Sequence, residues 1–137
     1  MKKLMILLFA LMSFAAFGES QVKLAEVSRF DGRAIGYAGT ASPNYEAFRA
    51  ELARGEAAAP LFEELLKSGP PAAKLYAALG LYRLDQSRGV QALESLRNDT
   101  TPVSGMSGCL MEQSTVGKMA AELLKDNAAA AQSYLPR

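Results

Sequence analysis

Between residues 43 and 124, apolar side chains recur about once per helical turn, and this periodicity constrains the fold of the 137-residue chain most strongly. Residues three, four and seven positions apart lie on one face of an α-helix, so each such group predicts a helix with one buried stripe. Tyr45, Phe48 and Leu52 are an example. The sequence shows no convincing alternation of apolar and polar residues that would predict strands. We therefore predict an all-α fold, a small antiparallel array of about five helices.

Local start and stop signals place the ends of these helices. Ser42 before Pro43 is a preferred N-cap followed by proline at the first helical position, and Asp85 or Ser87 can cap a later helix. The predicted helices cover residues 43–54, 60–68, 72–84, 89–97 and about 115–127. The third helix carries only two charged residues, Lys74 and Arg83, so we expect it to be the most buried.

The first 18 residues are typical of a signal peptide. Two lysines precede a nearly continuous apolar run over residues 4–17, which ends at Gly18 in a small-x-small pattern. Fourteen helical residues span about 21 Å, well short of the roughly 30 Å hydrocarbon core, so a membrane-spanning helix is not expected. We therefore predict cleavage before Glu19, a periplasmic or secreted location, and no stable membrane anchor after cleavage.

The rest of the chain has the size and charge of one ordinary domain. Removal of residues 1–18 takes away two of the 15 basic residues and none of the 14 acidic ones, which leaves a net charge of −1. A nearly neutral chain offers no basic surface for nucleic acid, so no nucleic-acid partner is expected. We predict a weakly structured N-terminal segment over residues 19–41, followed by a helical domain over residues 42–137.

One part of the chain resembles a known repeat family. Glu64, Leu66 and Lys67 recur 30 residues later as Glu94, Leu96 and Arg97, each group closing a short helix. The segment "LFEELLKSGPPAAKLYAALGLYRLD" is similar to one short HEAT-type repeat, and "VQALESLRNDTTPV" resembles the start of a second. The resemblance covers about residues 58–126 and implies HEAT-like α-α hairpins, which usually bind other proteins. Ser104 to Gly108 depart from the pattern, because the family continues into a helix there.

The composition excludes several kinds of chemistry. The chain has no histidine and only one cysteine, which excludes Ser-His and Cys-His catalytic pairs and structural zinc sites. It also lacks the closely spaced carboxylates of a calcium loop and the glycine pattern of a phosphate-binding loop. We accordingly expect no enzyme activity, no metal and no cofactor.

The segment "TTPVSGMSGCLMEQSTVGK" is the one place where a binding site is predicted. We interpret it as a long loop, and long loops are often functional. The candidate binding residues are polar or nucleophilic: Thr101, Ser104, Ser107, Cys109, Gln113 and Ser114. The alternative is a structural turn in which Val103, Met106, Leu110 and Met111 pack onto the helices. A buried, inert Cys109 is the favoured reading, and a reactive thiol is the alternative.

These observations favour a binding function and do not indicate a specific chemical reaction. We expect a small exported domain that binds a protein partner through a helix face or the loop between Thr100 and Thr115. The alternative is a small-ligand carrier or weak enzyme that uses this loop with Cys109. A domain that contributes only stability is a third reading. The sequence identifies neither the partner nor the oligomeric state.

Overall fold

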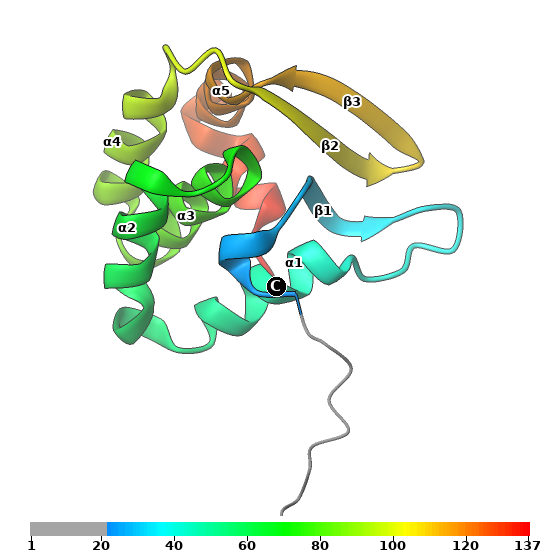
Figure 1. The fold of residues 1–137 in the computed structure, drawn as a ribbon, viewed down its shortest axis with the longest axis horizontal. Coiled ribbons are helices and arrows are strands. Elements are labelled where there is room, and N and C mark those ends of the chain that lie inside the picture. Colours follow the sequence, from blue (N-terminus) through cyan, green and yellow to red (C-terminus); the bar gives the residue numbers. More distant parts are fainter. Residues whose placement is uncertain (1–21) are drawn as a thin grey trace, which may run out of the picture.

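The computed structural model describes residues 22–137, so the predicted signal peptide, residues 1–18, lies outside the described residues. Figure 1 shows the helices and the small sheet of this part of the chain. The strands are β1 (Phe30–Ile35), β2 (Pro102–Gly108) and β3 (Leu110–Thr115). The helices are α1 (Pro43–Leu52), α2 (Ala59–Ser68), α3 (Pro71–Leu84), α4 (Gln86–Leu96) and α5 (Val116–Tyr134), with short 3-10 turns η1 (Leu24–Glu26) and η2 (Gly55–Ala58).

The helices begin where side chains satisfy their free backbone N–H groups. The Ser42 hydroxyl accepts hydrogen bonds from the N–H groups of Asn44 and Tyr45 at the start of α1. Asp85 accepts from two N–H groups at the start of α4, and Thr115 accepts from that of Lys118 in α5. The predicted cap at Ser42 is therefore confirmed, and of the two caps considered for the fourth helix the structure uses Asp85 and not Ser87. Helix α4 accordingly begins at Gln86, three residues before the predicted start at residue 89.

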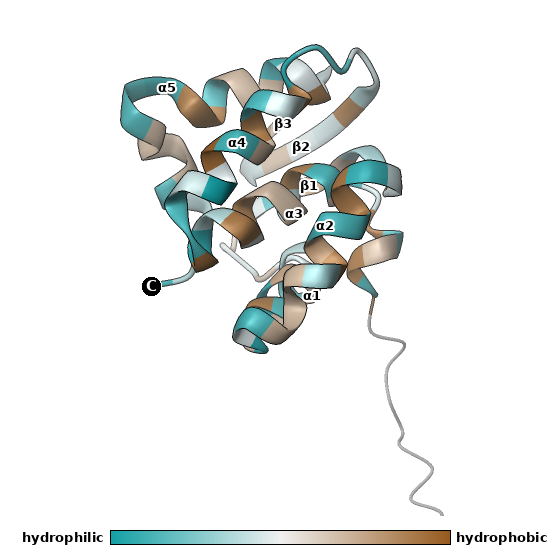
Figure 2. Ribbon diagram, turned by 90° about the vertical axis from the view of Figure 1, so that its left-hand side faces the viewer, coloured by the Kyte–Doolittle hydropathy of each residue, from teal (hydrophilic) through white to brown (hydrophobic). Residues whose placement is uncertain are grey.

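Helix α3 forms the centre of the molecule, as its low charge predicted. Its residues from Ala72 to Tyr82 are buried apart from Lys74, and Figure 2 shows α3 between α2 and α4. Two glycines allow these neighbours to approach. A Cβ atom added to Gly80 would lie 2.5 Å from the Phe62 ring of α2, and one on Gly89 of α4 would lie 2.1 Å from Cα of Tyr82. The close packing of α3 with both neighbours thus depends on the missing side chains.

The three strands form one mixed sheet in the order β1-β2-β3. β1 runs parallel to β2, with Phe30 opposite Gly105, and β2 runs antiparallel to β3. The face that carries Phe30 and Val103 packs on the helices, where both residues are buried. The chain between β1 and β2 contains α1, α2, α3 and α4, so the parallel pair joins segments that are distant in the sequence. Figure 1 shows the strands extending to one side of the helices.

The sheet shows that the prediction of an all-α, HEAT-like array is wrong. The residues interpreted as a long loop, Thr100 to Gln113, form β2 and most of β3, and β1 lies within residues 19–41. The strand signal is weak because β2 is rich in glycine and serine rather than in β-branched residues. Its partner β1 also lies far away in the sequence, so local periodicity carries no information about the pairing.

Helix α5 is interrupted near its middle. Lys125 to Ala128 have non-helical backbone angles, with positive φ at Asp126, Asn127 and Ala128. This bend returns the end of the chain to the core, where the Tyr134 ring stacks on Phe30 with centroids 4.8 Å apart. The Tyr45 hydroxyl donates a hydrogen bond of 2.5 Å to the carbonyl oxygen of Tyr134. In the described part of the chain, none of the helices combines the length and hydropathy of a membrane span.

Candidate functional site

The β2-β3 hairpin contains the predicted binding segment. Gly108 and Cys109 form its turn, between the paired residues Ser107 and Leu110. Gly108 has φ of 56°, a conformation that glycine adopts without strain and that two-residue hairpin turns favour at their first position. The sequence "SGCL" therefore forms a tight turn, and the register of all following pairs depends on it.

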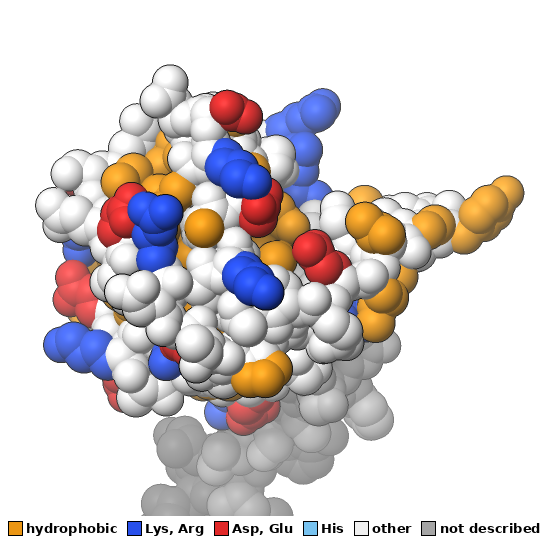
Figure 3. Space-filling view, turned by 90° about the horizontal axis from the view of Figure 1, so that it is seen from above, with side chains coloured by type: hydrophobic (Ala, Val, Ile, Leu, Met, Phe, Trp, Pro, Cys, Tyr) orange, Lys and Arg blue, Asp and Glu red, His pale blue; other side chains and the backbone are white. Residues whose placement is uncertain are grey.

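Large apolar side chains are exposed at the end of this hairpin. Leu110 is 70% exposed and Met111 is 54% exposed, and Tyr37 in the turn after β1 is fully exposed. Figure 3 shows hydrophobic side chains along the projecting arm and at its end. The alternative that Leu110 and Met111 pack onto the helices is wrong. The expectation of a buried Cys109 is also wrong, because its thiol is exposed. The helices cover the base of the sheet near Val103 and do not extend to its end.

The two edges of the sheet differ. The outer edge of β1 is occupied by the protein itself. The Tyr76 hydroxyl accepts from the N–H of Asp31 and donates to its C=O, both at 2.7 Å, and Ile35 exchanges two 2.9 Å backbone hydrogen bonds with Thr40. The pairing of β1 is also irregular between Asp31 and Ile35. This edge is closed to a further strand.

The outer edge of β3 is open. Ser107 and Leu110 close a two-residue turn, and the Val116 N–H donates to the Thr101 carbonyl oxygen at the other end of the ladder, at 2.9 Å. The antiparallel alternation between these ends directs the N–H and C=O groups of Met111 and Gln113 away from β2. Within residues 22–137 these groups have no backbone partner beyond β3. β3 is therefore a regular, six-residue edge strand with a free hydrogen-bonding side.

The predicted binding residues are spread over the whole hairpin. Ser104 and Gln113 lie opposite each other, and the Ser104 hydroxyl donates a 3.1 Å hydrogen bond to the Gln113 side-chain oxygen. Thr101, Ser107 and Cys109 are exposed at different places, and Ser114 is half-buried beside Val103. Only Ser104 and Gln113 are brought together, so the six residues do not surround a common cavity.

A buried carboxylate that the sequence analysis did not single out lies beside this sheet. Asp31 is completely buried and forms an ion pair with Arg29, while Ser42 and the side-chain amide of Asn44 donate hydrogen bonds to its Oδ2. Burial by itself would raise the pKa of Asp31, but the hydrogen bonds from Arg29, Ser42 and Asn44 outweigh it and the pKa is lowered. Ser42 was predicted as an N-cap, but nothing in the sequence shows that it also contacts Asp31.

Neither Asp31 nor a metal-binding cluster supplies a reactive site among the described residues. Asp31 is out of reach of a substrate, and the residues from 22 to 137 contain no cluster of three acidic, cysteine or histidine side chains that could hold a metal ion. Comparison of the chain with protein-family models, with curated proteins and with solved structures gave no match. The free edge of β3, with the apolar side chains beside it, is therefore the strongest candidate site.

Proposed function

We propose that this protein is an exported protein-interaction domain, and that it binds an extended segment of a partner protein along β3. The observation that supports this proposal is the contrast between the two edges of one sheet. β1 is closed by Tyr76 and Thr40, whereas β3 leaves its outward backbone groups free. Proteins normally protect edge strands with proline, lysine or a bulge, because an open edge pairs with other chains. β3 has the sequence "LMEQST" and contains neither proline nor lysine.

The side chains of β3 indicate what the partner segment should contain. Leu110 and Glu112 lie on one face of the strand, and Met111 and Gln113 lie on the other. An added strand would gain affinity from backbone hydrogen bonds, and specificity from the side chains beside these residues. We therefore expect apolar residues next to Leu110 and Met111, and a basic residue next to Glu112, the single charged residue of β3.

Replacement of Gln113 tests the role of the backbone directly. Gln113→Pro removes an N–H group that points away from β2, so the β2-β3 ladder keeps its hydrogen bonds while an added strand loses one. Gln113→Ala is the matched control, because it removes the same side chain and keeps the N–H group. The mature protein and both variants are used as bait against envelope extracts, and retained proteins are identified by mass spectrometry.

The proposal expects one protein to be retained by the wild type and by Gln113→Ala but lost with Gln113→Pro. Binding of that protein should protect the amides of Met111 and Gln113 from hydrogen exchange. Circular dichroism and thermal unfolding show that the proline variant is folded. Equal retention by all three baits, or retention of nothing by the wild type, would contradict the proposal.

A further inference from the structure

The arginines of this protein divide into two groups. Five of the eight form ion pairs with a carboxylate: Arg29, Arg49, Arg54, Arg88 and Arg97. Within residues 22–137, the other three, Arg33, Arg83 and Arg137, have neither an ion pair nor a side-chain hydrogen bond. All three line the same surface cavity, which is open to solvent and has a volume of about 780 Å³.

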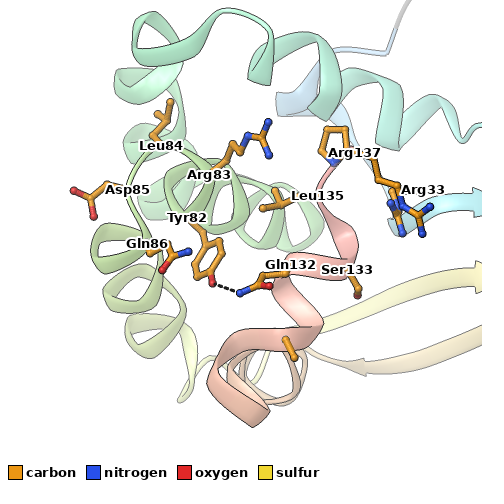
Figure 4. A pocket seen from close by; sticks show the side chains of 12 residues that line it. Arg33, Tyr82, Arg83, Leu84, Asp85, Gln86, Gln132, Ser133, Leu135 and Arg137 are labelled. Carbon is orange, nitrogen blue, oxygen red and sulfur yellow. Dashed lines mark hydrogen bonds between the residues drawn. The ribbon is translucent and has the colours of Figure 1, made fainter.

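This cavity lies where three distant parts of the chain meet. Figure 4 shows Arg33 on β1, Arg83 near the end of α3 and Arg137 on the C-terminal segment, with Leu135 between them. Because the three guanidinium groups come from different elements, helical or strand periodicity does not explain their grouping. All three side chains carry a positive charge, so an anion bound in this cavity would be attracted by each of them.

The other lining side chains add neutral donors and little negative charge. Tyr82, only 4% exposed, accepts a 3.2 Å hydrogen bond from the Gln132 amide, and its own hydroxyl proton has no acceptor among the described residues. Two carboxylates accompany the three arginines: the side chain of Asp85, whose Oδ1 accepts from the N–H groups of Ser87 and Arg88, and the main-chain carboxylate of Arg137, which leaves one positive charge in excess. The cavity therefore offers positive charge, free donors and a few apolar contacts.

We propose that this cavity binds a small molecule that carries at least two anionic groups, either phosphates or carboxylates. A guanidinium group binds a phosphate or a carboxylate through two parallel hydrogen bonds. Three arginines therefore match a ligand with several such groups better than a ligand with a single charge. Cavities of several hundred cubic ångströms commonly hold small molecules. Leu84, Leu135 and Pro136 would contact the carbon skeleton of such a ligand. This site is separate from β3 and does not depend on the binding of a protein there.

Titration with two simple probes tests the proposal. Pyrophosphate and citrate are added to the mature protein at low salt, and the Nε–Hε signals of all arginines are followed by nuclear magnetic resonance. We expect saturable shifts for Arg33, Arg83 and Arg137, with the five paired arginines unaffected. Tighter binding of pyrophosphate would identify a phosphate ligand, and tighter binding of citrate a polycarboxylate.

Variants that each remove one positive charge test which arginines bind the probes. Each of Arg33→Gln, Arg83→Gln and Arg137→Gln should weaken binding about tenfold, since each removes a charge-assisted hydrogen bond. Arg97→Gln, which removes a paired arginine at the surface, should leave binding unchanged. Arg83→Lys keeps the charge but loses the paired geometry, so its effect should be smaller than that of Arg83→Gln. The proposal would be overturned if a variant with Arg33, Arg83 and Arg137 all replaced by glutamine bound the probes as tightly as Arg97→Gln does. It would also be overturned if neither probe caused a saturable shift.

Discussion

The carboxylate of Asp31 accepts a hydrogen bond from the hydroxyl of Ser42, the residue that caps α1. The same hydroxyl oxygen accepts from the N–H groups of Asn44 and Tyr45. One serine therefore joins the buried carboxylate of β1 to the start of the first helix. This arrangement keeps a charged group in the interior because each of its oxygens has a donor.

Loss of the Asp31 charge should strongly destabilise the protein. Asp31→Asn keeps the size of the side chain but removes the charge that accepts hydrogen bonds from the partly exposed Arg29 and from Ser42 and Asn44, and loss of hydrogen bonds to a charged group costs about 1.5–3 kcal/mol. Glu122→Gln is the control, because it removes an exposed carboxylate that pairs with Lys125, and such pairs contribute less than about 0.5 kcal/mol. Urea unfolding measures both. Equal urea midpoints for Asp31→Asn and Glu122→Gln would show that the Asp31 charge does not stabilise the fold.

The contribution of Asp31 to stability should disappear in acid. Because the folded-state pKa lies below the ordinary value of 3.8, the unfolded chain binds the proton first as the pH falls. The stabilisation is thus complete above the ordinary pKa and is lost as the pH falls through the folded-state pKa. The difference in free energy of unfolding between wild type and Asp31→Asn should be constant near neutral pH and should shrink in acid. A difference that grows as the pH falls would contradict the direction of the shift.

Gly89→Ala should destabilise the protein although it replaces glycine within a helix. In an exposed helix this change would add about 1 kcal/mol of stability. Here the new Cβ would lie 2.1 Å from the Cα and 2.5 Å from the backbone nitrogen of Tyr82, so α3 and α4 must move apart. Overpacking of this kind costs about 1–3 kcal/mol, so after the helix gain of about 1 kcal/mol we expect a net loss of up to about 2 kcal/mol. Gln91→Ala, at an exposed position of the same helix, is the control and should be neutral in thermal unfolding.

The thiol of Cys109 should react freely in the folded protein. It lies in the hairpin turn and is exposed, so a maleimide should reach it without any unfolding. We expect the labelling rates in buffer and in concentrated denaturant to agree within about threefold, since the thiol is already exposed in the native state. Slow labelling that accelerates strongly on unfolding would mean that the turn is buried.

The helices could be predicted from the sequence because their signals are local. Ser42, Asp85 and Thr115 each cap a helix within three residues of their own position, and the apolar residues of each helix recur over a few turns. The strands could not be predicted in this way. Phe30 pairs with Gly105, which no short window of sequence includes, and neither glycine nor serine in β2 favours a strand.

The sequence singled out the segment from Thr100 to Thr115 as the place for a binding site, and that assignment stays a prediction. Its polar side chains were the predicted contacts, whereas the structure presents the backbone of β3 at the open edge. The free groups of Met111 and Gln113 become visible only once the register of the hairpin is known. The arginine cavity gave no signal at all, because Arg33, Arg83 and Arg137 are widely separated in the chain and meet only in the folded protein.

The parallel pairing of β1 with β2 has a consequence for how the molecule is assembled. Hairpin β2-β3 can form from neighbouring residues, but β1 reaches it only after the chain has passed through α1 to α4, and such long-range closure is slow. Until β1 docks, the side of β2 that β1 will occupy has no hydrogen-bonding partner. An incompletely folded copy can then accept the first strand of another copy in place of its own. The time before docking is therefore when this chain is most open to domain swapping.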